Sequence, residues 1–588
     1  MVNLTKNKFI SAKITAGNDL SFLFEDSYKE NGNNRNDPYK VSLSRERVHL
    51  AKFLFIFIFA IFIVRSTSLA IFPGEILSKP NKIISNSIKN PLPEIYDRNG
   101  KLLVTTVETK RASIRNPVNP KETARMINAV IPDLNKDILL NKLENKNYVE
   151  IADNINDIQY YDILNSGVAE VEFHSVWKRI YVNKQLASHI IGYSGRDLVG
   201  LSGIEKTIPK SKIPHEDIKL SIDISVQFHL EDQIAKGIEL YGAESGFGIV
   251  MDANNGQIIA SASLPTFDPN IINKNYKNTA IRKSTFNQVF QGSYELGSVM
   301  KIMTLAMGLE SSQIDLNDTF DDNTCIKISA NRCLNNYRNQ SSEQLISSVD
   351  CLVRSSNRCM AQIAIKVGKE NQKSFLQKIG LLDEYLLEVD ETGSPILPER
   401  WTNNSMITIS FGQGLSVVPL SFTSSVASMV NGGYKIQPSL NYYNNSKKEN
   451  RVIREDTSKK TIYAMRQVVK HGSGQKADIK GYAVIGKTGT ADIPCNGTYS
   501  GCGNRTSFAG AFPGWDPKYV ILVSFERPKE NPSRGIMGGS SYHNAGPTAG
   551  EIIRLIAPIL NVEYDIDKDV KNPQMDTSKN NLIGENSL

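Results

Sequence analysis

Three short segments of this 588-residue chain carry side chains whose types and spacing could do chemistry. The first is Ser298–Lys301, a serine followed three residues later by a lysine, at the start of an apolar run, Ile302–Met307. That run predicts a buried helix with both side chains on one face, and a helix N-terminus stabilises negative charge that develops at a serine. An amine in such apolar surroundings is partly desolvated, which favours its neutral, basic form. We therefore expect Ser298 to be a nucleophile and Lys301 its base, although a capping serine beside a solvated lysine has the same spacing.

The second segment is Ser355–Asn357, and the third is Gly486–Thr490, which follows an expected strand at Tyr482–Ile485. A lysine followed by a hydroxyl and a glycine at a strand edge can hold a carboxylate and leave room for a substrate backbone. Taken alone, the second segment could be a simple helix-capping turn and the third a polar turn that closes a strand. The three together, in this order, are far more specific than any one of them.

In this order the segments match S-x-x-K, S-x-N and K-[ST]-G, and the chain resembles the penicillin-recognising serine enzymes. Four further stretches look like the pedestal signatures of class B penicillin-binding proteins: Asp97–Gly100, Arg179–Tyr181, Ala187–Gly192 and Gly203–Glu205. Three others resemble the septal, cell-division subgroup (the FtsI type): Ile409–Leu420, Asn431–Gly433 and Phe508–Pro517. The chain departs from the family at Leu296, where most class B members have proline, while the nucleophile and the helix start are unchanged.

The resemblance implies a mechanism on stem peptides that end in D-Ala-D-Ala. Ser298 would attack the penultimate carbonyl, and Lys301 would accept its proton. The backbone N–H groups of Ser298 and Thr490 would form the oxyanion hole, usually the largest single stabilising contribution. Ser355 would relay the proton to the leaving D-Ala, and Asn357 would orient Lys301 and the amide of the donor.

The same resemblance implies that the third motif recognises the substrate. Lys487, Thr488 and Thr490 would hold the terminal carboxylate, and Gly489 would leave room for the substrate backbone. An acceptor amine from a neighbouring peptidoglycan strand would then resolve the acyl-enzyme, and β-lactam antibiotics would acylate the same serine.

No cofactor or metal is needed. By resemblance, the protein partners would be a membrane glycan polymerase and other division proteins.

Several rival functions remain open at this point. The nearest is an elongation-type class B transpeptidase, which shares the whole mechanism. A D,D-carboxypeptidase or β-lactamase is less well supported, because the chain has a large pedestal module and no recognisable deacylating glutamate loop. A penicillin-binding sensor would need a cytoplasmic signalling module, and residues 1–49 are too short and polar to be one.

Other chemistries find little support in the sequence. Gly481–Thr488 fits G-x-x-x-x-G-K-[ST] formally, but its interior has a strand pattern and no helix signal follows it, which argues against a phosphate-binding loop. The seven histidines show no metal-ligand spacing, and no G-x-S-x-G motif is present. The net charge of +7 is a weak bias for a chain of this length and does not indicate a nucleic-acid-binding protein.

The periodicity of the chain predicts the elements that would position these motifs. Apolar residues recur every four positions from Val226 to Ile238, as in an amphipathic helix, and a β-hairpin is expected at Phe247–Ser261 around an Asn-Gly step. Helical segments dominate from Ser298 to Leu382. Strand signals return at Tyr482–Ile485, Ser507–Phe512 and Tyr519–Phe525, before a last helix at Thr548–Leu560. We therefore expect an α+β fold, with an antiparallel sheet flanked by helices plus a helical lobe.

Composition divides the chain into five expected parts. They are a cytoplasmic tail (1–49), a transmembrane anchor (50–72), an elongated pedestal domain (73–215), a transpeptidase domain (216–561) and a disordered tail (562–588). The apolar run from Phe53 to Val64 is too short to cross a ~30 Å hydrocarbon core, but a segment from Leu50 to Phe72 can do so.

Basic residues precede this segment, which predicts a single-pass inner-membrane protein with its catalytic domain in the periplasm. A cleaved signal peptide ending near Ala70 is the alternative, although its leader would be unusually long.

The six cysteines suit disulfides in an oxidising compartment, with buried thiols as the alternative. Cys495 and Cys502 flank a turn rich in glycine and asparagine and are the best candidate pair. Cys351 and Cys359 would lie ~12 Å apart on one unbroken helix, so a bridge between them would need a reversal of the chain.

Overall fold

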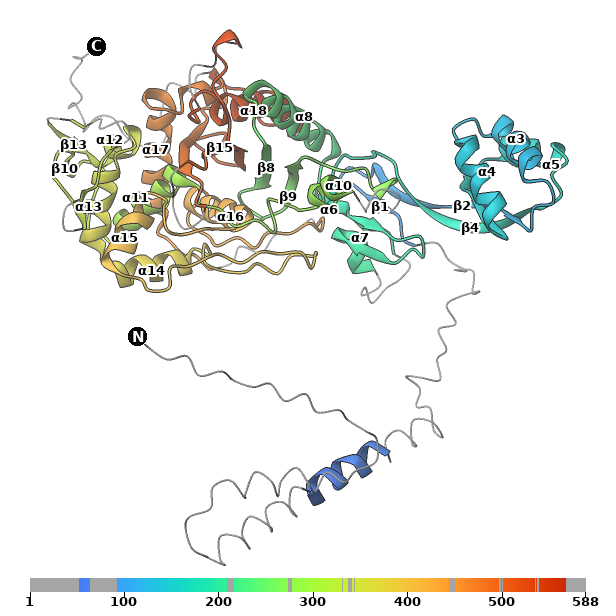
Figure 1. The fold of residues 1–588 in the computed structure, drawn as a ribbon. Coiled ribbons are helices and arrows are strands. Elements are labelled where there is room, and N and C mark those ends of the chain that lie inside the picture. Colours follow the sequence, from blue (N-terminus) through green and yellow to red (C-terminus); the bar gives the residue numbers. More distant parts are fainter. Residues whose placement is uncertain are drawn as a thin grey trace, which may run out of the picture. The chain divides into compact units, whose positions relative to one another are not determined.

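The structure, a computed structural model, describes residues 52–63, 92–208, 216–272, 278–329, 332–336, 341–342, 344–443, 450–495, 499, 501–534, 536 and 539–566 (Figure 1). The chain divides into two units, Met1–Ser87 and Ile88–Leu588. In the first unit, residues 52–63 form an exposed apolar helix. No described helix has both the length and the apolar content needed to cross a membrane. The expected tail at 1–49, the rest of the expected anchor and residues 567–588 lie outside the described residues.

Two long antiparallel strands form the arms of the pedestal in the second unit. Strand β2 (Leu102–Arg115) pairs with β4 (Val171–Tyr181) from Val104↔Tyr181 to Ile114↔Val171. At the far end of the arms, β3 (Tyr148–Ile155) pairs with the last residues of β2. Three helices complete this end: α3 (Pro120–Val130), α4 (Lys136–Asn145) and α5 (Asp157–Asn165). An asparagine caps the first turn of each helix, and a small apolar core of its own holds the group together.

A buried ion pair fixes the base of the arms. Arg179 on β4 donates to Glu205 at 2.8 Å and to Thr106 on β2 at 2.9 Å. Both charged side chains are almost fully buried. Glu205 belongs to α7 (Gly203–Thr207), so the pair joins the strands to the short helices beside the catalytic lobe. Because loss of one partner would leave an uncompensated buried charge, this contact strongly favours one arrangement of the junction.

A five-stranded antiparallel sheet, in the order β14-β15-β16-β8-β9, is the centre of the catalytic lobe. Its strands are β8 (Ser245–Asp252), β9 (Ile258–Leu264), β14 (Ile485–Asp492), β15 (Asn504–Phe512) and β16 (Tyr519–Glu526). Strands β8 and β9 form the expected hairpin, in which Gly256 has a φ of 79°. Helices α8 (Ile224–Tyr241) and α18 (Ala545–Ile559) pack together against the sheet. Strand β14 is at an edge of the sheet, so one side of its backbone is available to other segments.

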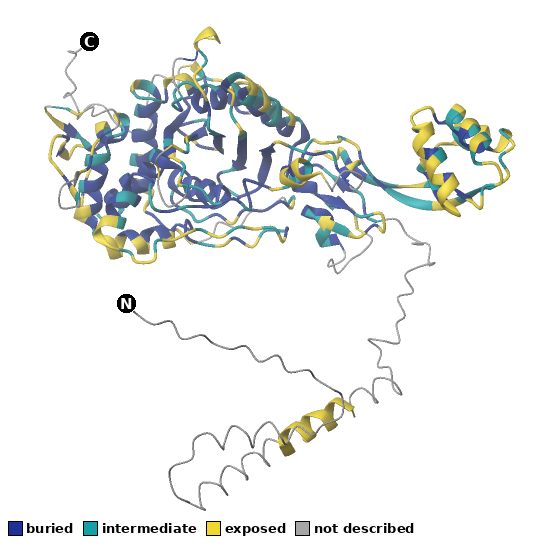
Figure 2. Cartoon of the chain, in the orientation of Figure 1, coloured by how far each residue is buried: buried dark blue, intermediate teal, exposed yellow. Residues whose placement is uncertain are grey.

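The helical lobe packs beside this edge strand. Its helices are α11 (Lys301–Glu310), α12 (Ser348–Val353), α13 (Asn357–Val367), α14 (Lys369–Lys378), α15 (Asn403–Ser410), α16 (Pro419–Val430) and α17 (Glu455–His471). Every residue of α11 from Lys301 to Leu309 is buried, and so is the whole of α16. Figure 2 shows this buried interior around the sheet, in contrast to the exposed helices at the end of the pedestal arms. The expected α+β architecture of sheet, flanking helices and helical lobe is therefore present.

Some expected boundaries were wrong. The third motif was expected to follow a strand at Tyr482–Ile485, whereas the strand begins at Ile485 and contains the whole motif. Glycine, lysine and aspartate are weak strand formers, and pairing with β15 along all eight residues overrides that preference. The last helix begins at Ala545, three residues before the expected start, because Asn544 caps its first turn.

Candidate active site

The nucleophile turn is a short 3₁₀ helix, Gly297–Met300, that leads directly into α11. Gly297 has a φ of 63°, and a Cβ at this position would lie 2.5 Å from the carbonyl oxygen of Thr490. A Cβ at Gly412 would lie only 1.9 Å from the carbonyl oxygen of Gly297. Glycine is required at both positions because three backbone segments meet at this turn. Ser298 is half-buried at their junction, and its hydroxyl has no hydrogen-bond partner among the described residues.

Lys301 is the first residue of α11 and is completely buried. Its Nζ donates to the carbonyl oxygen of Ser355 at 2.6 Å, to Asn357 Oδ1 at 2.7 Å and to Ser355 Oγ at 3.1 Å. Burial, followed by repulsion from Lys487, holds the pKa of Lys301 well below its usual value. The side chain is therefore suited to act as a neutral base. Its amine contacts the second motif, and no direct hydrogen bond to Ser298 is formed in the described structure.

Ser355 lies where the chain reverses between α12 and α13. Its φ of 58° is in the left-handed region, which is uncommon for a serine. The reversal brings Ser355 Oγ within 3.0 Å of Lys487 Nζ as well as 3.1 Å of Lys301 Nζ. One hydroxyl therefore connects the lysines of the first and third motifs. Lys487 is also buried, and its burial lowers the pKa to about 7.

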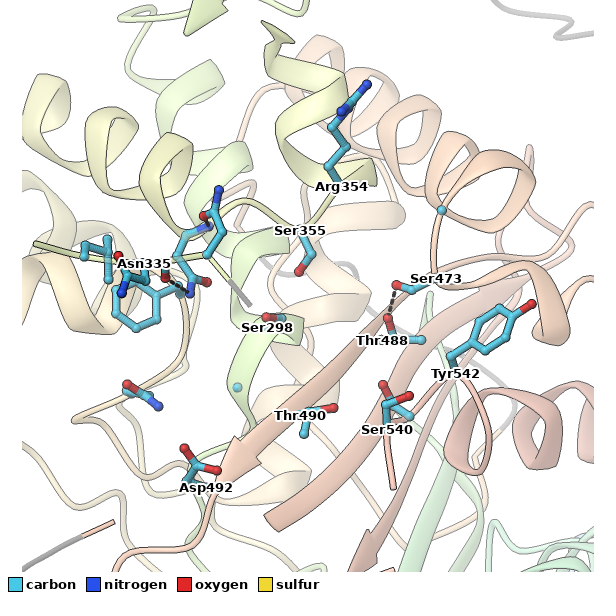
Figure 3. Close-up of a pocket in the computed structure, with 18 of the residues that line it drawn as sticks. Ser298, Asn335, Arg354, Ser355, Ser473, Thr488, Thr490, Asp492, Ser540 and Tyr542 are labelled. Carbon is cyan, nitrogen blue, oxygen red and sulfur yellow. Dashed lines mark hydrogen bonds between the residues drawn. The ribbon is translucent and has the colours of Figure 1, made fainter. Parts of the chain in front are cut away.

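The third motif presents alternate residues of β14 to the cleft. Thr488 and Thr490 line it, and Thr488 shares a hydrogen bond with Ser473 from the segment after α17 (Figure 3). A Cβ at Gly489 would lie 2.5 Å from the carbonyl oxygen of Leu296, so the strand lies against the nucleophile turn. The Thr490 carbonyl points towards Gly297, and in an antiparallel strand the N–H of the same residue points to the same side. The Thr490 N–H is therefore directed towards the nucleophile turn, as an oxyanion hole requires.

One cleft of about 800 Å³ is lined by Ser298, Ser355, Asn357, Thr488 and Thr490, and the two lysines lie buried behind this surface. Figure 3 shows Ser298 at its centre, Ser355 and Thr488 on one side of the serine, and Thr490 followed by Asp492 on the other. The structure thus brings together all the side chains that the sequence motifs indicated. They come from the nucleophile turn, the reversal between two helices and the edge strand, which are far apart in the chain.

Comparison with known protein families agrees with this geometry. Residues 246–554 match the penicillin binding protein transpeptidase domain, and residues 93–211 match the penicillin-binding protein dimerisation domain. The chain belongs to the class B penicillin-binding proteins. The transpeptidase match alone covers more than half of the chain and contains all three motifs.

Relatives of this penicillin-binding protein match it over most of their length. It is 28% identical over 494 residues to a probable peptidoglycan D,D-transpeptidase FtsI of Caulobacter vibrioides, covering 80% of this chain and 81% of the relative. It is 27% identical over 598 residues to the stage V sporulation protein D of Bacillus subtilis, covering 91% and 90%. A probable peptidoglycan D,D-transpeptidase PbpC of Pseudomonas aeruginosa is 26% identical over 479 residues, covering 74% and 81%.

A buried carboxylate that the motifs did not indicate holds the second motif of this penicillin-binding protein in place. Asp322 accepts hydrogen bonds from the Ser356 hydroxyl and from Asn336 Nδ2, the latter at 2.7 Å. Asn336 Oδ1 in turn accepts from the Asn357 backbone N–H at 2.8 Å. A disulfide, Cys325–Cys333, closes the segment between Asp322 and Asn336. Sequence reasoning missed Asp322 because nothing local to it marks a partner 34 residues away.

A second unrecognised contact supports the nucleophile turn. Glu295 Oε1 accepts hydrogen bonds from the Gly414 N–H at 3.0 Å and from the Tyr499 hydroxyl at 2.8 Å. Burial raises the pKa of Glu295, and the hydrogen bonds partly offset that effect. Tyr499 lies between Cys495 and Cys502, which form the expected disulfide. The disulfide-closed segment is thereby attached to the residues just before Ser298.

The remaining two cysteines are buried thiols. The chain does reverse between Cys351 and Cys359, and the two residues remain free thiols, with the Cys359 thiol donating to Asp322 at 3.9 Å. Burial, followed by the neighbouring Cys359, raises the pKa of Cys351. The alternative of buried thiols is therefore correct for this pair, whereas Cys325–Cys333 is a disulfide that sequence reasoning did not single out.

Proposed function

We propose that this enzyme is a peptidoglycan D,D-transpeptidase of the division septum, acting through an acyl-enzyme on Ser298. The observation that carries the mechanism is the position of Ser355 Oγ, 3.1 Å from Lys301 Nζ and 3.0 Å from Lys487 Nζ. This hydroxyl can pass a proton between the site of nucleophilic attack and the site where the leaving amine departs. The transpeptidase match and the names of the relatives support the reaction.

Acylation begins with attack of Ser298 Oγ on the penultimate carbonyl of the donor peptide, while Lys301 takes the serine proton. Lys301 can do so because burial lowers its pKa and so favours the neutral amine. The N–H groups of Ser298 and Thr490 would stabilise the oxyanion. The bond from this carbonyl carbon to the nitrogen of the terminal D-Ala then breaks, and Ser355 delivers a proton to that nitrogen.

Substrate binding would rely mainly on the third motif, on strand β14. Lys487, Thr488 and Thr490 would hold the terminal carboxylate, and Gly489 would admit the donor backbone. Asn357 accepts from Lys301 in the structure and would orient both it and the donor's amide. An acceptor amine then attacks the ester carbonyl and loses one proton to the site, while Ser298 regains its own. The two half-reactions together consume no net proton and need no cofactor.

Labelling by a β-lactam tests the nucleophile, because the strained lactam carbonyl is attacked by the same serine. Treatment with penicillin should raise the intact mass by one adduct, and Ser298→Ala should abolish that increase. Labelling of the variant at the level of the native protein would contradict the assignment of Ser298.

The septal role rests on two observations. Ile409–Leu420 and Phe508–Pro517 resemble the cell-division subgroup, and a relative from Caulobacter vibrioides carries the name FtsI. A stage V sporulation protein is similar to a comparable degree, so an elongation or other specialised role is the main alternative. A fluorescent fusion should concentrate at midcell, and depletion should block septation. Localisation along the side wall, with normal division after depletion, would contradict the septal role.

The proposed location is the inner membrane, with the pedestal and the transpeptidase domain in the periplasm. The two disulfides of the catalytic lobe support an oxidising compartment. We further propose that the segment from Leu50 to Phe72 binds a membrane glycan polymerase, since Arg65 would cost roughly 1–3 kcal/mol near the outer boundary of a span without a partner. Exchange of this segment for an unrelated anchor of equal length should reduce recruitment to midcell. Unchanged recruitment would mean that the segment is only a tether.

A further inference from the structure

One end of the catalytic cleft carries an acidic side chain that the mechanism above does not use. Asp492 is the last residue of β14 and follows Thr488 and Thr490 on the same face of the strand. It is exposed, lines the cleft, and has no hydrogen bond or ion pair with any described residue. Among the described lining residues it is the only carboxylate. Its negative charge is therefore available to a ligand in the cleft.

The charged groups of the cleft are separated by sign. Lys487, whose charge would hold the donor's carboxylate, lies 3.0 Å from Ser355 Oγ, beside the amine of Lys301. Asp492 lies beyond Ser298 and Thr490 from these groups (Figure 3). The positive end suits the donor's terminal carboxylate, so a ligand group at the other end would carry the opposite charge.

An aromatic side chain also lines the cleft. Tyr499 lines the same cavity, and its hydroxyl is fixed by a 2.8 Å hydrogen bond to Glu295. The Cys495–Cys502 disulfide closes the segment that contains this tyrosine. Asp492 and Tyr499 line the same cavity, and the charge of Asp492 contributes to the raised pKa of Tyr499, after burial and the bond to Glu295. A carboxylate beside an aromatic ring is a combination that binds ammonium groups.

We propose that Asp492 and Tyr499 form a subsite for the ammonium group of a stem-peptide diamino acid. The inference rests on the proposed transpeptidase function and specifies a part of its substrate. Asp492 is two residues from Thr490, about 6.7 Å along an extended strand. That distance suits an ammonium on the donor residue that precedes D-Ala-D-Ala. The same distance suits the acceptor amine, which has to bind beside the acyl-enzyme. An amine with a pKa of about 10.4 is protonated when it binds, so it carries a positive charge.

The test uses the full-length protein in detergent and compares Asp492→Asn with Asp516→Asn. Asp516 is an exposed aspartate in the turn between β15 and β16, at the opposite end of the sheet from Asp492. In a donor arm, D-alanyl thioester peptides carry a side-chain amine that is either free or acetylated, and the ratio of their acylation rates is measured. In an acceptor arm, the thioester lacks an amine, and the ratio of aminolysis to hydrolysis is measured with an added diamino-acid peptide.

We expect Asp492→Asn to lower one of these two ratios by about three- to tenfold, with the effect reduced by added salt. A loss in the donor arm assigns the subsite to the donor, and a loss in the acceptor arm assigns it to the acceptor. Unchanged ratios in both arms, or an equal loss in Asp516→Asn, would overturn the proposal. Failure of the wild-type protein to form any acyl-enzyme would instead contradict the transpeptidase function itself.

Discussion

Replacement of Lys487 by glutamine removes one of the two amines that share Ser355 Oγ. At 3.0 and 3.1 Å from one oxygen, the two lysine nitrogens are separated by at most about 6 Å. With an effective dielectric constant of about 20, two unit charges at this largest distance repel by about 2.8 kcal/mol, and closer charges repel more. Because the charge of Lys487 lowers the pKa of Lys301, its removal should raise that pKa.

The assay is the second-order rate constant for acylation by a fluorescent penicillin, measured from pH 5 to pH 9. In the native enzyme the rate should rise as Lys301 loses its proton and fall above pH 7, because burial lowers the pKa of Lys487 to about 7 and its charge is lost there. In Lys487→Gln the acidic limb should move to higher pH, because the repulsion that lowers the pKa of Lys301 is lost. The alkaline limb near pH 7 should disappear, and the maximal rate should also fall because the carboxylate partner is missing.

Lys487→Arg is the matched control, since it keeps a positive charge at the same position. Its acidic limb should stay close to that of the native enzyme even if its maximal rate falls. An unmoved acidic limb in Lys487→Gln would refute the proposed electrostatic coupling of the two lysines. An equal displacement in Lys487→Arg would show that packing, and not charge, determines the pKa of Lys301.

Three further outcomes follow from the geometry. Lys301→Ala should acylate about 10²–10⁴-fold more slowly than the native enzyme, measured by the same penicillin reaction, and a rate near the native value would contradict its role as base. Gly489→Ala should lose acylation while its circular dichroism stays native, because the added Cβ would lie 2.5 Å from the carbonyl oxygen of Leu296; native activity would show that this contact can relax. Denatured protein should bind two maleimides per chain without reductant, at Cys351 and Cys359, and six after reduction, whereas no label before reduction would indicate a third disulfide.

Features of the fold and the site that depend on residues close together in the sequence could be predicted. Ser298 and Lys301 are three residues apart at the start of an apolar helix, and helical geometry alone places both on one face. The hairpin of β8 and β9 was likewise marked by its Asn-Gly step and flanking apolar residues. Such short-range patterns specify backbone geometry directly.

Contacts between distant segments could not be predicted in this way. Asp322 reaches Ser356, and Tyr499 reaches Glu295 across 204 positions, only because the complete fold brings them together. The extent of β14 was also misjudged, since eight pairings with β15 stabilise a sequence whose composition suggests a turn. The choice of cysteine partners is a similar case, because spacing does not distinguish a bridged pair from two neighbouring thiols.

The backbone at Ser355 sets a limit on how stable this enzyme can become. A left-handed conformation costs a serine roughly 1–2 kcal/mol relative to the ordinary helical region, and a glycine or an asparagine adopts it more readily. Selection for thermal stability alone would therefore favour replacement of this residue. Selection for catalysis retains the hydroxyl that joins the two lysines. Variants recovered from a stability screen should thus include substitutions of Ser355 that melt at a higher temperature and no longer turn over substrate.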